Sequence, residues 1–168
     1  YLPGKDLQHL PEQGWTLKRR IQLFSQTAAA VAFAHPHGII HRDIKPANIV
    51  LDAKGDAVLT DFDIVDMSVA ETRSLHTGGL GTPLFAAPEQ LSSTAEALPT
   101  ADIYSLGKLL YEMATGLDRM EFPRLPAAAA TTGEIEEFAE LNEVLLRACD
   151  RDPARRYRSA EELRRGML

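Results

Sequence analysis

Four polar residues in the first half of the chain have the types needed for chemistry on a phosphate group. Residues 41–48 read His-Arg-Asp-Ile-Lys-Pro-Ala-Asn, and an Asp-Phe pair follows at positions 61 and 62. Phosphoryl transfer needs a carboxylate to orient and deprotonate a hydroxyl, a cation over the transferring group and oxygen ligands for Mg²⁺. The sequence supplies these types as Asp43, Lys45, Asn48 and Asp61. The stretch therefore predicts a phosphoryl-transfer site.

A short hairpin must bring the two ends of this set together. Two runs of strand-forming residues, 49–51 and 57–60, are separated by a turn signal at residues 54–56. A hairpin returns the chain to the edge from which it started. We therefore expect Asn48 and Asp61 to lie at the same edge.

Helical periodicity flanks the hairpin on both sides. Apolar residues at intervals of three and four predict a helix from Thr16 to Pro36 and another over 100–116. Two further helices are expected at 134–149 and 159–168. Residues 62–99 contain many glycines and prolines, and we expect this segment to be mostly irregular. The sequence thus predicts a mainly α fold, a helical bundle with one small hairpin.

The composition is typical of a single globular domain. The chain has 168 residues, of which 45% are hydrophobic, and its net charge is −6. A negative balance without a basic block argues against a nucleic-acid partner, and the short basic run at 18–20 is interpreted as a solvated helix face. No apolar run is long enough to span a bilayer. The single cysteine, Cys149, fits a reducing compartment, so we expect a cytoplasmic protein, with a membrane anchor outside this chain left open.

Further motifs follow the first two in a fixed order. They are Gly-Thr-x-x-Phe-x-Ala-Pro-Glu at 81–89, Asp-Ile-Tyr-Ser-x-Gly at 102–107 and Asp-Pro-x-x-Arg at 152–156. The ordered set resembles the signature of the eukaryotic-type serine/threonine protein kinases, in the form that bacteria also have. The resemblance implies that residues 1–168 form the larger, C-terminal lobe of the catalytic domain, which carries the catalytic and metal loops on its hairpin. The small N-terminal lobe would then be absent from this chain.

The resemblance implies a role for each residue of the first two motifs. Asp43 would be the catalytic base, and Lys45 would bind and neutralise the γ-phosphate of ATP. Asn48 and Asp61 would hold Mg²⁺ beside the nucleotide. Lys45 together with Thr82 implies Ser/Thr hydroxyls of a protein substrate as the phosphate acceptor. The implied function is that of a serine/threonine protein kinase.

The resemblance also implies a regulatory contact. Arg42 matches the arginine that pairs with a phosphorylated residue of the activation loop, a contact that orders such loops by charge-assisted hydrogen bonds. The candidate phosphorylation sites are Thr72, Ser74 and Thr77.

Four more residues would support the site without touching substrate. His41 would be a structural anchor bonded to backbone near Asp61, and Asp102 would brace the catalytic loop from the central helix. Glu89 and Arg156 resemble the buried ion pair of the family, whose loss leaves an uncompensated charge.

Two departures from the family pattern leave alternatives open. Asp63 stands where the family has the glycine of Asp-Phe-Gly, and the 168 residues contain neither a G-x-G-x-x-G-x-V loop nor a V-A-I-K-type lysine. We therefore expect the isolated lobe to be inactive without the small lobe. One alternative is a pseudokinase, an interaction module without phosphotransfer. A small-molecule phosphotransferase of the aminoglycoside-kinase type is less favoured, because Thr82 and residues 87–89 match a shelf that receives a peptide.

Overall fold

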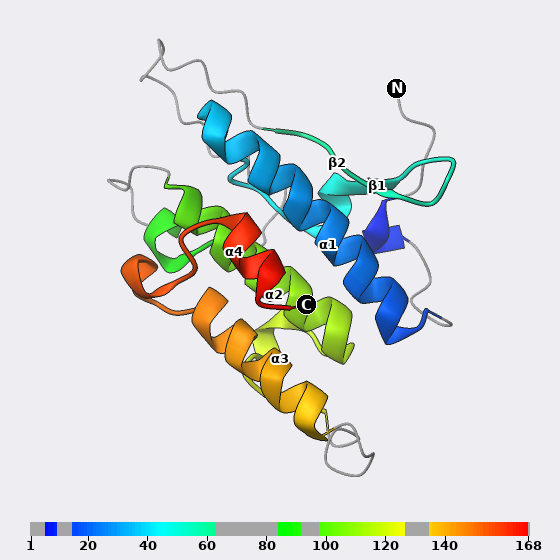
Figure 1. Ribbon diagram of the computed structural model, residues 1–168, viewed down its shortest axis with the longest axis vertical. Coiled ribbons are helices and arrows are strands. Elements are labelled where there is room, and N and C mark those ends of the chain that lie inside the picture. The colour runs from blue at the N-terminus through cyan, green and yellow to red at the C-terminus, as the bar shows by residue number, and fades with distance from the viewer. Residues whose placement is uncertain (1–5, 10–14, 63–83, 92–97, 127–134, 168) are drawn as a thin grey trace.

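The computed structural model describes residues 6–9, 15–62, 84–91, 98–126 and 135–167 (Figure 1). Within these residues the fold is mainly helical, as predicted, with one two-stranded antiparallel sheet. α1 packs against α2, α4 and β2, while α3 packs against the other side of α2 (Figure 1). The elements are α1 (Leu17–Ala34), β1 (Ile49–Leu51), β2 (Ala57–Leu59), α2 (Pro99–Thr115), α3 (Ile135–Ala148) and α4 (Ala160–Arg165).

The first long helix begins and ends close to the predicted residues. Thr16 is its N-cap, and the hydroxyl oxygen of Thr16 accepts a hydrogen bond from the Arg19 amide at 3.3 Å. The apolar stripe is buried in the core of the domain. The helix ends at Ala34 because Pro36, two residues later, has no amide hydrogen for a further turn. α1 is thereby a rigid, well-packed support for the hairpin beside it.

The central helix, α2, is buried on nearly all of its surface. Eleven of its 17 residues are buried, which is expected of a helix that is surrounded by other elements. Gly107 allows α3 to approach closely, since a Cβ there would lie 2.6 Å from the Cys149 sulfur. Burial raises the pKa of the Cys149 thiol to about 12, so this cysteine packs as a small apolar group. Gly116 closes the helix with a φ of 68°.

The two strands form the predicted hairpin with a defined register. Ile49 lies opposite Leu59 and Leu51 lies opposite Ala57. The turn between the strands contains Gly55 at a φ of 84°, a left-handed conformation that suits glycine.

Two predicted features differ in the structure. The last helix stops at Arg165 instead of residue 168, because Gly166 is a poor helix former. The basic run at 18–20 is not simply a solvated face. Arg19 and Arg20 are half-buried, and their guanidinium groups donate to the backbone carbonyls of Gly55 and Met113. Both arginines therefore connect α1 to neighbouring elements.

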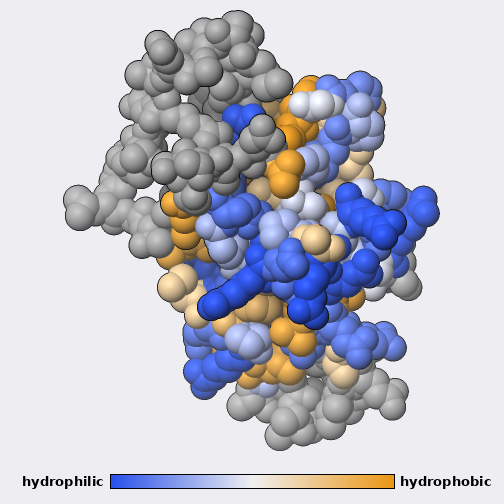
Figure 2. Space-filling view, turned by 90° about the vertical axis from the view of Figure 1, so that its left-hand side faces the viewer, coloured by the Kyte–Doolittle hydropathy of each residue, from blue (hydrophilic) through white to orange (hydrophobic). Residues whose placement is uncertain are grey.

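On the face of the molecule shown in Figure 2, hydrophilic residues gather near the centre, with smaller hydrophobic patches around them. The connection between α3 and α4, at the left of Figure 1, lies on this face. Its exposed residues include Arg151, Asp152, Arg155 and Arg158. Among the residues that the structure describes, no helix is both long enough and apolar enough to cross a membrane.

Candidate active site

Asp102, in the first turn of α2, holds the start of residues 41–48, the candidate catalytic loop. Its buried carboxylate accepts hydrogen bonds from the backbone amides of His41 and Arg42, both at 2.8 Å. The ring of His35 lies 2.9 Å from the same carboxylate. A buried carboxylate requires such partners, because burial without them is costly. The contact fixes the backbone of residues 41 and 42 against the core.

His41 connects the catalytic loop to the residues that follow β2. Its Nε2 lies 2.8 Å from the Thr60 carbonyl, and its Nδ1 accepts a hydrogen bond from the Asp43 amide at 3.3 Å. Since a carbonyl can only accept, the ring proton belongs on Nε2. The ring also packs against Phe62, with 4.7 Å between the ring centroids. His41 is fully buried and so anchors both segments at one point.

Asp43, Lys45 and the buried Asn48 form one hydrogen-bonded group, which reaches the surface at Asp43 and Lys45. The Lys45 ammonium donates to Oδ2 of Asp43 at 2.6 Å, and the Asn48 amide donates to the same oxygen at 3.1 Å. The Asn48 amide also donates to the Asp43 carbonyl at 2.7 Å. The Asp43 side chain is 54% exposed, so a group of another molecule can reach it. A carboxylate, a cation and an amide thus meet on one open side of the molecule.

Asn48 and Asp61 lie at the same edge of the hairpin. The Thr60 amide and hydroxyl both donate to the Asn48 carbonyl, at 2.8 and 3.1 Å. The same hydroxyl lies 3.3 Å from the Asp61 carboxylate. Thr60 therefore joins the two residues that the sequence predicts as metal ligands. Sequence analysis did not single out Thr60, and its position directly before Asp61 is the only signal that could have done so.

The donor set at this edge fits Mg²⁺. Asn48 uses its amide hydrogens toward Asp43, and no described residue donates to its Oδ1. This leaves one amide oxygen and the exposed Asp61 carboxylate as hard oxygen ligands. Across the described residues, no group of three His, Cys, Asp or Glu side chains could hold a metal. Two protein oxygens completed by phosphate and water are the usual environment of Mg²⁺.

Two residues of the site have a left-handed backbone that is unusual outside glycine. Arg42 has a φ of 69° and Asp61 has a φ of 56°. Aspartate tolerates this conformation better than most residues, whereas arginine does not. For Arg42, the carboxylate of Asp102 holds the backbone amide, and the Gln90 side chain donates to the carbonyl at 3.1 Å. Strain of this kind is typical of functional sites.

The predicted regulatory residues are only partly described. Nε of Arg42 is buried and has no hydrogen-bond partner among the described residues. Thr72, Ser74, Thr77, Thr82 and Asp63 lie outside those residues, so their roles remain predictions.

Glu89 and Arg156 form a two-point ion pair next to α2. The two terminal nitrogens of the guanidinium donate to the two carboxylate oxygens at 2.6 and 2.8 Å. Burial would raise the pKa of Glu89, but the hydrogen bond and charge of Arg156 outweigh burial and hold it below its usual value. Arg156 also donates to the carbonyls of Thr100, Asp150 and Arg151. All five N–H groups of this buried arginine therefore have acceptors.

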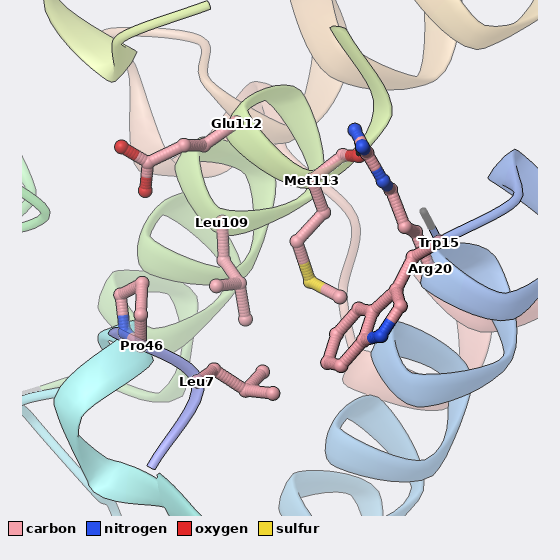
Figure 3. A pocket seen from close by; sticks show the side chains of 7 residues that line it. All are labelled: Leu7, Trp15, Arg20, Pro46, Leu109, Glu112 and Met113. Carbon is pink, nitrogen blue, oxygen red and sulfur yellow. Dashed lines mark hydrogen bonds between the residues drawn. The ribbon is translucent and has the colours of Figure 1, made fainter. Parts of the chain in front are cut away.

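A small apolar pocket lies beside the catalytic loop but does not include the residues predicted to act on phosphate (Figure 3). Pro46, next to Lys45 in the sequence, forms one of its walls. The Arg20 and Glu112 side chains border it on either side of Met113 (Figure 3). The other lining residues are Leu7, Trp15 and Leu109.

Comparison with known proteins identifies the family. The protein kinase domain family matches residues 1–165, and the chain therefore belongs to the protein kinase family. A probable serine/threonine-protein kinase of Clostridium perfringens is 32% identical over 97% of this chain and 25% of its own length. The serine/threonine-protein kinase PknB of Mycobacterium tuberculosis is 31% identical over 98% of this chain and 28% of its own length.

A third relative is the serine/threonine-protein kinase PrkC of Bacillus subtilis, which is 32% identical over 87% of this chain and 24% of its own length. The resemblance drawn from the ordered motifs is thus confirmed. The chain spans about a quarter of the length of these curated relatives.

Proposed function

We propose that residues 1–168 act as the large lobe of a serine/threonine protein kinase that transfers the γ-phosphoryl group of ATP to protein hydroxyls. The observation that carries this proposal is the contact of Asp43 with both Lys45 and Asn48. The names of the relatives, which are serine/threonine-protein kinases, support the same activity. We further propose a cytoplasmic location, since the one cysteine is a buried thiol.

In this proposal Asp43 acts on the substrate hydroxyl. The carboxylate orients the hydroxyl and takes its proton while the oxygen bonds to the γ-phosphorus and the bond to the bridging oxygen of ADP breaks. The exposure of Asp43 supports this role, since the acceptor belongs to another protein. Lys45, whose ammonium lies 2.6 Å from Asp43, supplies positive charge for the transferring phosphoryl group.

Asn48 and Asp61 are the proposed Mg²⁺ ligands. Asn48 contributes Oδ1, since its amide hydrogens bind Asp43, and Asp61 contributes its exposed carboxylate. A bound Mg²⁺ neutralises charge on the phosphate oxygens. ATP binding in this family also uses a glycine-rich loop and a strand lysine, which the 168 residues do not contain. We propose that a small lobe supplies both.

Arg42 is the proposed receiver of a phosphate on the activation loop. Its buried Nε, which has no hydrogen-bond partner among the described residues, supports this role, because a phosphate oxygen would satisfy that donor. The proposed phosphorylation sites are Thr72, Ser74 and Thr77, with Thr82 assigned to the substrate-binding side of the catalytic aspartate.

The decisive experiment measures γ-phosphate transfer from Mg-ATP by the full-length protein, both to itself and to a generic Ser/Thr substrate. Asp43→Asn should lower the rate by about 10²–10⁴-fold, the usual contribution of general acid–base catalysis. Glu140→Gln is the matched control, because Glu140 is an exposed carboxylate on α3. If a folded full-length protein transfers no more phosphate than the background of the Asp43→Asn variant, the pseudokinase alternative is favoured.

A further inference from the structure

The turn between β1 and β2 is held to α1 by side chains that do not belong to the site. Nε2 of Gln26 donates to the Asp56 carboxylate at 2.7 Å. The Ala57 amide donates to Oε1 of the same glutamine at 2.8 Å. Arg19, two turns earlier on α1, donates to the Gly55 carbonyl. Three consecutive residues of the hairpin are therefore bound to one helix.

These contacts matter because the hairpin is very short. Each strand has three residues, and a two-stranded hairpin is marginally stable on its own. A slip of one residue would turn every side chain of a strand to the opposite face. Asn48 directly precedes β1, and Asp61 follows β2 after one residue. The register of the hairpin therefore decides how these two side chains meet.

Contacts within the turn do not locate it relative to α1. The Asp52 carboxylate accepts hydrogen bonds from the amides of Lys54 and Asp56, at 2.8 and 2.9 Å, and so fixes the shape of the turn. Gln26 instead binds one side chain and one backbone amide of the turn from outside. Its amide group uses its donor end and its acceptor end at once, so it is matched to a single register. The nearby residues Phe24, Thr27 and Ala28 are buried, so the backbone of Gln26 belongs to a packed part of α1.

We propose that Gln26 is a positioning residue for the pair Asn48 and Asp61, acting from the far end of the hairpin by locking its register. This inference rests on the proposed function, in which these two residues hold Mg²⁺. The link from the lock to the site is the bond between the Thr60 amide and the Asn48 carbonyl, which exists only in this register.

The test uses a charge change and its reversal in the full-length protein. Gln26→Glu places two carboxylates next to each other where Gln26 now donates to Asp56. This hydrogen bond should therefore break, and the register of the hairpin should no longer be held. Asp56→Asn alone keeps an oxygen that accepts from Gln26 and should be tolerated. In the double variant, the amide introduced at position 56 donates to one oxygen of the carboxylate introduced at position 26, while the other oxygen accepts from the Ala57 amide. Both bonds are then restored: donor and acceptor are exchanged in the bond between side chains 26 and 56, while the Ala57 amide donates as before.

The first readout is the Mg²⁺ concentration that gives half-maximal phosphotransfer at saturating ATP. Gln26→Glu should raise this concentration by up to about 10-fold, the lower end of the effect of losing a residue bonded directly to a metal ligand, because Gln26 acts on the two proposed ligands only through the hairpin. The double variant should have a midpoint within about twofold of that of the natural protein, and so should the control Gln8→Glu, at an exposed glutamine outside α1. General destabilisation would lower the rate at every Mg²⁺ concentration without moving the midpoint. An unchanged midpoint in Gln26→Glu would overturn the proposal.

The second readout is amide hydrogen exchange at Thr60, which needs no activity. Gln26→Glu should speed exchange at this amide, and the double variant should slow it again, because its bond to the Asn48 carbonyl depends on the register. Unchanged exchange at Thr60 would overturn the register lock even if phosphotransfer is normal. Faster exchange in a full-length protein without phosphotransfer would support the lock and contradict the proposed function.

Discussion

Asp102 and Arg156 are two buried charges beside the first turns of α2, and the protein satisfies them in opposite ways. The Asp102 carboxylate is bound by two backbone amides and the His35 ring. The Arg156 guanidinium is bound by the Glu89 carboxylate and three backbone carbonyls. The anion is thus held mainly by donors of the main chain. The Arg156 cation is held by the opposite charge of the Glu89 carboxylate as well as by main-chain acceptors.

The partners of the two charges explain their separate tasks. The amides bound to Asp102 belong to residues 41 and 42, directly before the proposed catalytic base. Arg156 instead joins Glu89 to residues 100, 150 and 151, which lie in different parts of the chain. We infer that Asp102 holds the backbone of the candidate site in place. Arg156 instead closes the fold, in the sense that it holds together segments that are distant in the sequence. Variants of the two residues should separate stability from activity.

The largest effect on stability is expected from Arg156→Met. The change leaves the half-buried Glu89 carboxylate and three carbonyls without their donor, and such losses cost about 3–5 kcal/mol of unfolding free energy. Urea unfolding measures this directly. Arg155→Met is the control, because the neighbouring arginine is exposed and should change stability by less than about 0.5 kcal/mol. Similar losses in both variants would show that Arg156 does not close the fold.

A smaller loss of stability, but a larger loss of activity, is expected from Asp102→Asn. The amide has one acceptor oxygen for three donors, which leaves a buried donor unsatisfied at a cost of about 1–3 kcal/mol. Because the released amide belongs to the catalytic loop, kcat per folded molecule should fall further than in Arg156→Met. Measuring kcat for both variants at a temperature where both are folded tests whether Asp102 acts mainly on activity and Arg156 mainly on stability. A lower kcat in Arg156→Met than in Asp102→Asn would contradict this division of roles.

The smallest effect concerns the pH dependence of the Glu89 contact. Because the pKa of folded Glu89 lies below its ordinary value of 4.5, its stabilisation is complete above that pH. It is lost as the pH falls through the lower pKa of the folded state. Glu89→Gln should therefore lose less unfolding free energy than the natural protein between about pH 6 and pH 3.

Urea unfolding at both pH values gives the comparison for Glu89→Gln. Glu161, whose pKa the hydrogen bonds from Arg164 and Arg165 lower to about 2, also loses its contribution in acid. Glu161 is present in both the natural protein and the Glu89→Gln variant, so its contribution to the pH dependence cancels in the comparison. Parallel pH profiles for the two proteins would show that Arg156 does not stabilise the charged form of Glu89.

The elements were predictable from the sequence, while several contacts between them were not. Periodicity and caps predict α1 to within two residues, because these signals are local. The roles proposed for Asp43 and Asn48 could be inferred from residue type and spacing. Arg19 and Gln26 gave no such signal, since their partners on the hairpin are about 30 residues away in sequence. The left-handed backbone of Arg42 was equally hidden, because arginine rarely adopts it.

The left-handed backbones of Arg42 and Asp61 also affect how this domain can be engineered. A selection for thermal stability alone would favour glycine at both positions, most strongly at Arg42, where a left-handed backbone with a side chain costs of order 1–3 kcal/mol of conformational energy. Those replacements would relax the backbone and delete one proposed metal ligand and one proposed phosphate receiver. Stabilising libraries for this domain should therefore keep positions 42 and 61 unchanged, because the gain in stability there would come at the expense of activity.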